Sequence, residues 1–149
     1  MRRVFPIIGL LALVLPAGLA AQSDRDVVMR QLDAVRDRNS SSGWHVASGS
    51  LGGGTVIGQL SNAGTVVLEL NLKGGRDHLI PAGCDHDCSD LDLRVYTGDG
   101  NTLLTEDVGD DDVPVVAFTP SESGRYLLLI SMPKCSTPVC WFGFRVFEK

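Results

Sequence analysis

The sequence is short of basic residues and lacks the motifs that commonly mark enzymes. Its 149 residues include 13 lysines and arginines against 18 aspartates and glutamates, which gives a net charge of −5. A nucleic-acid-binding protein needs a basic face to neutralise phosphates, so this balance argues against that class. Neither the G-x-S-x-G motif of serine hydrolases nor the H-E-x-x-H motif of zinc peptidases occurs. We therefore expect a protein that is not an enzyme.

Long apolar runs are also missing, except at the N-terminus. Arg2 and Arg3 precede an apolar run over residues 4–16, and small residues follow at 17–21. This order is typical of a cleaved secretory signal peptide, predicted to end near Ala21. A membrane anchor is the alternative, although the run is shorter than the roughly 20 residues that a span needs. The sequence thus predicts a secreted or periplasmic protein with no membrane span after cleavage.

Beyond residue 21 the pattern predicts a short helical segment followed by one domain. Residues 23–38 place Val28, Leu32 and Val35 at helical spacing. The polar stretch 39–43 follows as a linker. The helix either leans on the domain or serves only as a tether. We therefore divide the chain into a signal peptide (1–21), a helix with its linker (22–43) and a domain (44–149).

The domain shows the two-residue period of strands rather than a helical pattern. In the segment 65–72 the residues Val66, Leu68, Leu70 and Leu72 share one face. Glycine- and aspartate-rich turns separate the other segments, which are 78–82, 91–96, 102–106, 113–118, 125–132 and 141–147. Strands this short and closely spaced predict an all-β fold, an antiparallel two-sheet β-sandwich of the jelly-roll or immunoglobulin-like type. A closed barrel is the alternative.

Four cysteines form two close pairs, Cys84 with Cys88 and Cys135 with Cys140. An even number of cysteines in an exported chain predicts two disulfides. Three pairings are possible, and we favour the local one, in which each disulfide closes a loop between strands. A zinc site with four thiolate ligands is the alternative, but its usual spacing is tighter and export disfavours free thiolates.

Acidic residues gather between positions 85 and 112, where Arg94 is the only basic residue. Like charges this close repel one another unless a cation or solvent relieves them. Calcium binds through six to eight oxygens, which carboxylates and carbonyls of such loops supply. A solvated acidic edge is the alternative, since the spacing does not match an EF-hand. The candidate calcium ligands are Asp90, Asp92, Asp107 and Asp110, followed by Asp85 and Asp87.

An ordered set of short motifs resembles the bacterial pre-peptidase C-terminal domain family. Asp90–Leu93 opens a strand, a turn follows at 99–101, and Asp107 comes after the next strand. Further along lie the segment 118–120 and the strand opening at 124–128. The resemblance covers residues from about 55 to 147. It implies a β-sandwich accessory module without catalytic activity, of a kind in which some members bind calcium. The cysteine pairs are additions to the family's pattern, and no peptidase precedes the domain.

The partner of such a module stays open between a protein and a glycan of the envelope or exterior. Trp141 either packs on a disulfide or lines a surface on which a sugar stacks. Two other functions remain as alternatives. One is a structural envelope protein without a small ligand, and the other is a metal-dependent hydrolase that uses the acidic loops.

Overall fold

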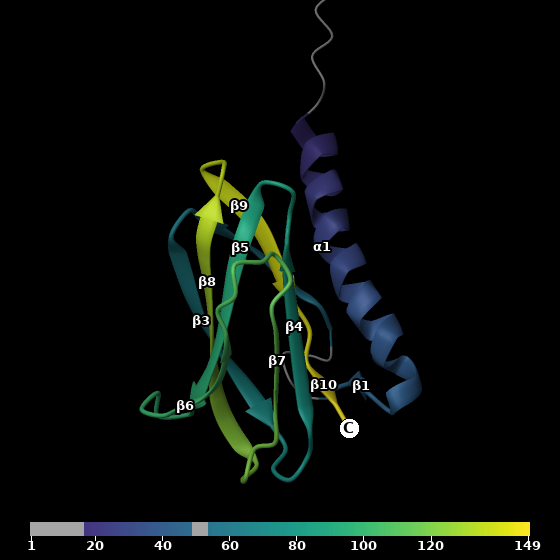
Figure 1. The fold of residues 1–149 in the computed structure, drawn as a ribbon, viewed down its shortest axis with the longest axis vertical. Helices are drawn as coiled ribbons and strands as arrows, with labels where there is room; N and C mark the ends of the chain where they lie inside the picture. The colour runs from purple at the N-terminus through teal and green to yellow at the C-terminus, as the bar shows by residue number, and fades with distance from the viewer. Residues whose placement is uncertain (1–16, 49–53) are drawn as a thin grey trace, which may run out of the picture.

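The computed structural model describes residues 17–48 and 54–149, which form a β-sandwich with one helix on its outside (Figure 1). The predicted signal peptide falls largely outside the described residues, so its cleavage stays a prediction. The two-sheet antiparallel sandwich predicted from the strand pattern is confirmed. Within the described residues, no helix is long and apolar enough to cross a membrane.

The first sheet has six strands in the order β1–β10–β4–β9–β2, and β7 pairs with β4. Its long central member, β4, is buried along its whole length because one face meets the sandwich core and the other meets the helix. The bounds are β1 (His45–Val46), β2 (Val56–Ser61), β4 (His78–Cys84), β7 (Val115–Phe118), β9 (Val139–Phe144) and β10 (Phe147–Glu148).

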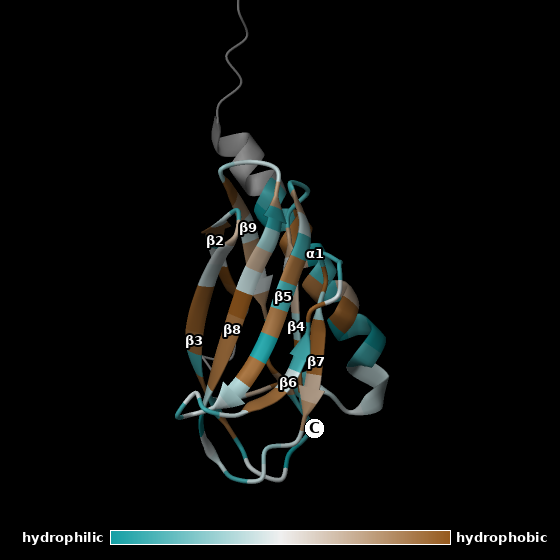
Figure 2. Cartoon of the chain, turned by 60° about the vertical axis from the view of Figure 1, so that its left-hand side comes forward, coloured by the Kyte–Doolittle hydropathy of each residue, from teal (hydrophilic) through white to brown (hydrophobic). Residues whose placement is uncertain are grey.

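The second sheet has four strands in the order β3–β8–β5–β6. The alternation predicted for β3 is confirmed, since Leu70 and Leu72 are buried whereas Val67 is 53% exposed. Leu91, Leu93 and Val95 of β5 are fully buried in the core between the sheets. Figure 2 shows the apolar colouring along β3 and β8. The bounds are β3 (Gly64–Leu72), β5 (Cys88–Thr97), β6 (Leu103–Asp107) and β8 (Gly124–Cys135).

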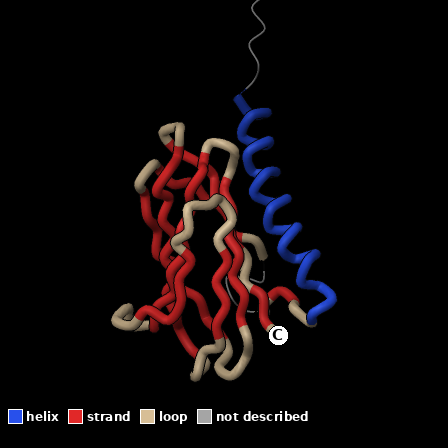
Figure 3. The backbone as a smooth tube through the Cα atoms, in the orientation of Figure 1, coloured by secondary structure: helices blue, strands red, loops and turns tan. Residues whose placement is uncertain are grey.

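The helix α1 (Ala17–Asn39) lies along the outer face of the six-stranded sheet, beside β4 and β9 (Figure 3). Its predicted stripe of Val28, Leu32 and Val35 is buried to 3% exposure or less. A helix with a buried stripe is held by packing, so it is part of the folded unit rather than a tether. A short 3-10 turn, η1 (Ser40–Ser42), follows it, and Gly43 ends this turn with a left-handed φ of 85°.

The helix packs against the sheet at a pair of glycines. Gly83 of β4 and Gly143 of β9 lie opposite each other in the strand register. A Cβ atom on Gly143 would lie 2.8 Å from the Val28 Cγ1 atom, and one on Gly83 would collide with the Gln31 side chain. Because neither glycine has a side chain, the helix approaches the sheet closely at these two positions. No local pattern in the sequence indicates this pair.

The prediction of one final strand over residues 141–147 is wrong, because the strand is interrupted. β9 ends at Phe144 and β10 begins at Phe147, and both pair with β4. The gap lies opposite Pro81, which has no backbone N–H to donate. The Arg145 backbone N–H still donates to the Pro81 carbonyl at 3.2 Å, but Pro81 cannot return a bond. The Arg145 side chain instead donates to Asp33 of α1 at 2.7 Å.

Candidate functional site

The two disulfide loops lie side by side at one end of the sandwich. Cys84 is bonded to Cys88 and Cys135 to Cys140, so the favoured local pairing is confirmed. Cys88 also faces Cys135 in the β5–β8 register. The Ser136 backbone N–H donates to the Asp87 carbonyl at 2.8 Å. Each disulfide is local, but this pairing and the hydrogen bonds join the two loops into one unit.

Asp85 holds the first disulfide loop against the start of β9. Its carboxylate accepts hydrogen bonds from the backbone N–H groups of Trp141, at 2.6 Å, and Asp87, at 3.1 Å. Burial raises the pKa of this carboxyl, and the two backbone hydrogen bonds oppose that rise. Asp85 is only 3% exposed. Its role in the described contacts is to fix the loop rather than to present a charge.

Lys134 brings two of the candidate ligands together. Its ammonium group forms ion pairs with Asp110 and, at 3.7 Å, with Asp90. Asp90 is 8% exposed and its Oδ1 atom has no hydrogen-bond partner among the described residues. Burial raises the pKa of Asp90, whereas the hydrogen bond from Lys134 lowers the pKa of the exposed Asp110. The Lys134 ammonium group therefore offsets part of the negative charge of Asp90 and Asp110.

The remaining candidates have other partners, although the charge of Asp92 lies close enough to raise the pKa of Asp90 further. Asp92 of β5 contacts its neighbour Arg94 at 3.5 Å, and Arg94 also pairs with Glu106 of β6 at 3.0 Å. Asp107 accepts the backbone N–H groups of Val115, at 2.9 Å, and Gly109, at 3.3 Å, and so shapes the loop between β6 and β7. The six candidates thus divide among separate local contacts.

The described residues do not fit a resident metal site. Across residues 17–48 and 54–149, no three side chains of histidine, cysteine, aspartate or glutamate gather closely enough to hold a metal ion. At Asp90 and Asp110, the only place where two candidates share a partner in this part of the chain, that partner is an ammonium group. Calcium needs several oxygens around one point. The calcium binding predicted from the sequence therefore stays untested, and the described side chains do not support it.

This end instead presents negative charge on a fixed framework. Asp87, Asp110 and Asp111 are exposed, as is the neighbouring His86. Asp112 is held by the Gln31 side-chain amide of α1 at 2.9 Å, so the helix supports the β6–β7 loop. Charges fixed on a rigid support attract an oppositely charged surface without a large ordering cost. We call this set of loops, 84–88, 108–114 and 135–140, together with the adjoining Asp90 and Lys134, the acidic end.

Sequence reasoning missed two groups at the acidic end that come from distant parts of the chain. Lys134 lies outside the acidic segment in sequence, and Arg25 lies on the helix. The Arg25 guanidinium stands 5.7 Å from the centre of the Trp141 ring. This contact is a cation–π interaction, so Trp141 packs against the helix. In the sequence, Arg25 lies in the predicted helix and Lys134 just beyond a predicted strand, and neither position specifies a partner.

No protein-family model matches the chain, and no curated protein matches it. Solved structures do match. A pre-peptidase C-terminal domain of a Bacillus anthracis collagenase aligns over 62% of this chain and 87% of its own, with 13% identity and a TM-score of 0.50. The fold is similar to that of a pre-peptidase C-terminal domain. A periplasmic inhibitor of g-type lysozyme from Aeromonas hydrophila aligns over 72% of this chain and 90% of its own, with 14% identity and a TM-score of 0.50.

The resemblance stated from the sequence motifs is therefore confirmed for the fold. The calcium binding that the family resemblance implied does not follow from that likeness. The two disulfides indicate folding in an oxidising compartment.

Proposed function

We propose that this chain is an exported, non-catalytic binding module whose acidic end engages a positively charged protein surface. The observation that carries the proposal is the acidic end itself. Exposed Asp87 stands there on one of two disulfide loops that hydrogen bonds join, and exposed Asp110 and Asp111 stand on the adjacent β6–β7 loop. The neighbouring Lys134 is already paired with two carboxylates. Export through a cleaved signal peptide is part of the proposal.

The chemistry of the acidic end favours association rather than a reaction. Its two buried carboxylates, Asp85 and Asp90, already contact backbone N–H groups or Lys134. Of the exposed ones, Asp87 and Asp111 face solvent and Asp110 pairs with Lys134. Such an arrangement steers a cationic partner and raises its association rate, with a strong dependence on salt. The similar fold from Aeromonas hydrophila is that of a lysozyme inhibitor, which makes lysozymes a reasonable first partner to test.

Calorimetric titration of the mature protein with g-type and c-type lysozymes tests the proposal. The variant D87N/D110N/D111N removes three exposed charges but keeps the side-chain sizes. We expect it to weaken binding at least about tenfold and to reduce the salt dependence. The matched control is D37N/E69Q/E106Q, which neutralises three exposed acids elsewhere and should bind like the wild type.

Two results would count against the proposal. If the control weakens binding as much as the test variant, only net charge matters and the acidic end is not a site. If neither lysozyme binds and a panel of other basic proteins also fails, a cationic protein is not the partner. Inhibition of lysozyme activity by the wild type, lost in the test variant, would extend the proposal from binding to inhibition.

A further inference from the structure

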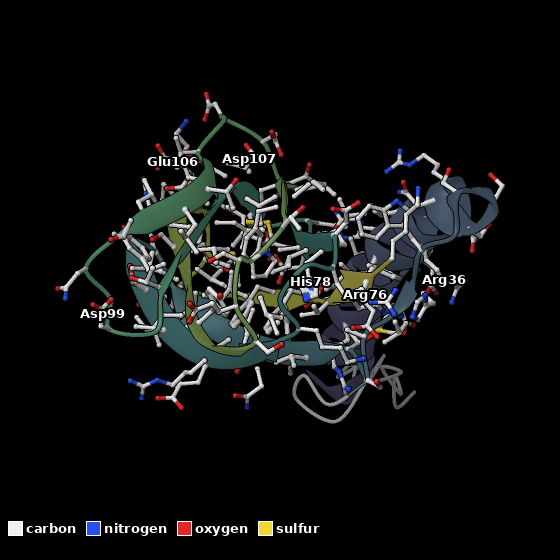
Figure 4. All side chains as sticks on the ribbon, turned by 90° about the horizontal axis from the view of Figure 1, so that it is seen from below. Arg36, Arg76, His78, Asp99, Glu106 and Asp107 are labelled. Atoms are coloured by element: carbon white, nitrogen blue, oxygen red, sulfur yellow. A yellow bond between two sulfur atoms is a disulfide. The ribbon has the colours of Figure 1, made fainter. Side chains whose placement is uncertain are left out.

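The two long sides of the sandwich differ in how their strand edges are protected. β2 and β3 form one side, β6 and β7 form the other, and each has one edge without a strand partner in the described part of the chain (Figure 2). β6 has an irregular register with β5 and carries two acids, Glu106 and Asp107, which lie at this side of the sandwich (Figure 4). The Asp107 carboxylate also accepts the Val115 backbone N–H of β7 at 2.9 Å. Charges and irregular registers are the features by which proteins prevent unwanted strand pairing. Residues 54–68, which include β2 and the first half of β3, contain no charged residue and no proline.

β3 offers the longest open edge on the unprotected side. It pairs with β8 at nine successive positions without a register shift, from Gly64 to Leu72. β2 has six residues and carries Gly58 near its middle, and a glycine weakens a strand because it has no side chain to pack. A partner strand therefore finds more main-chain donors and acceptors at β3 than at β2.

The main-chain groups of every second β3 residue point away from the sheet. The Ala63 backbone N–H donates to the Met132 carbonyl at 2.8 Å, so the main-chain groups of Met132 face β3. Such groups alternate sides along a strand, so every second residue of β8 bonds to the β3 residue opposite it, starting with Gly64 opposite Met132. The intervening residues of β3 direct their N–H and carbonyl groups to the open edge. They include Thr65, Val67 and Glu69.

β3 is complementary to an antiparallel second copy of itself. The facing pairs in the register centred on Val67 are Val67 with Val67, Thr65 with Glu69, and Val66 with Leu68. Three outward-facing residues of each strand then meet, and the strands exchange about six hydrogen bonds. Val67 is 53% exposed in one chain, and Val66 and Leu68 are only partly buried, so the pairing covers apolar surface. Glu69, the one charged residue of β3, meets a threonine hydroxyl rather than a second carboxylate.

The antiparallel orientation also keeps the acidic ends of two chains apart. β3 begins next to the acidic end, where the Asn62 side chain accepts the Cys135 backbone N–H at 2.9 Å. Because Val67 is close to the start of β3, at Gly64, the two starts lie about 20 Å apart along the paired strands. This separation is more than twice the Debye length of about 8 Å at physiological salt. We propose that the protein forms a two-fold symmetric dimer in which the β3 strands of two copies pair edge to edge. Such a dimer presents its two acidic ends in opposite directions.

The mass of the protein in solution and the protection of its amides test the dimer. Sedimentation equilibrium of the mature protein from about 10 μM to about 1 mM covers the affinities of weak and moderate dimers. We expect the mass to rise with concentration to twice that of one chain. Amide hydrogen exchange, followed by NMR at both ends of this range, locates the contact. The N–H groups of Thr65, Val67 and Glu69 should become more protected as the concentration rises, whereas that of Gln59 in β2 should not change.

Three substitutions of exposed valines distinguish edge pairing from other contacts. Val67→Lys places two like charges opposite each other at the two-fold axis and should weaken dimerisation at least about tenfold. Val67→Thr keeps a β-branched residue with high strand propensity, so its dimerisation should stay within a few-fold of the wild type. The matched control Val139→Lys makes the same substitution at a valine that is 48% exposed at the acidic end, and should dimerise at least as well as the wild type. Circular dichroism verifies that each variant is folded.

Four results would overturn the proposed dimer. They are a monomer at about 1 mM, an unchanged dimer in Val67→Lys, equal losses in Val67→Lys and Val139→Lys, and protection of Gln59 in place of Val67. A loss in Val67→Thr as large as that in Val67→Lys would show apolar face packing instead of edge pairing. An extended peptide that protects the β3 amides of a monomeric protein would show that the edge binds a foreign strand and not a second copy. The variant D87N/D110N/D111N should dimerise at least as well as the wild type, so failure of the dimer and failure of the acidic end are distinguishable.

Discussion

Substitution of Gly143 by alanine should destabilise the protein because it pushes the helix away from the sheet. The new Cβ atom would lie 2.8 Å from Val28 Cγ1 and 2.9 Å from the Val56 carbonyl oxygen. Alanine ordinarily gains about 0.4–1 kcal/mol over glycine through the unfolded chain. Overpacking of this kind costs about 1–3 kcal/mol. The steric cost should exceed the gain, which leaves a loss of about 1–2 kcal/mol in the free energy of unfolding.

The second half of this test is a double-mutant cycle with the helix. Val28→Ala alone leaves a cavity and should cost about 2 kcal/mol. Combined with Gly143→Ala, it makes room for the new methyl group, so the double variant should be more stable than the sum of the two losses predicts by about 1 kcal/mol. The rescue should be incomplete, because the Val56 carbonyl is backbone and cannot retreat.

Urea denaturation followed by circular dichroism measures all four proteins. The matched control is Gly124→Ala, where a Cβ atom would meet nothing within 4 Å. That control should be as stable as the wild type or slightly more stable. If Gly143→Ala behaves like Gly124→Ala, or if the cycle shows no coupling with Val28, the helix does not pack on the glycine pair.

Four further predictions concern the charged groups and the disulfides. Asp99, whose pKa the hydrogen bond from Thr97 lowers from 3.8 to about 2, stabilises the β5–β6 turn above pH 4 and loses this effect as the pH falls towards 2. Stability titrations of Asp99→Asn should therefore be flatter over that window, and an unchanged titration would contradict this. Lys134→Met should lower the Tm at pH 7 by a few degrees because Asp90 loses its cation, and adding Asp90→Asn should recover most of the loss; no recovery would show that Asp90 is not the cause. Thermal melts in calcium and in chelator should give the same Tm, because an ammonium already lies between Asp90 and Asp110; a clear rise with calcium would support the calcium site instead. Replacing both cysteines of either disulfide by serine should cost about 2 kcal/mol, the chain-entropy value for so short a loop, and a melt equal to the wild type would contradict it.

Most strands were predictable from the sequence because a strand with one buried face alternates apolar and polar residues. β3 and β5 alternate apolar and polar residues, and the structure buries the predicted faces. The continuous segment at 78–84 carried no such pattern, since both of its faces are covered. The interruption after Phe144 depends on Pro81, which lies far away in sequence and adjacent in the sheet.

The candidate site was predicted only in part, for a related reason. Many carboxylates lie close together in one segment of the sequence. The predicted calcium site rested on that density alone. Strand geometry then separated them, since Asp92 points to Arg94 while Asp90 meets Lys134 from β8. Which acids share a cation depends on the register of β5 against β8, and no local pattern fixes that register.

By itself, the sequence predicted the class of fold and the amphipathic helix and favoured the local disulfides, because periodicity, helical stripes and close cysteine spacing are local properties. Only the tertiary structure decided where the helix lies, which charges are paired, and how the ends of the sandwich differ. Gly83 and Gly143 form one contact surface for the helix only because β4 and β9 are neighbours in the sheet. In the same way, Trp44 and His78 line one hollow only because the chain returns to the same end of the sheet.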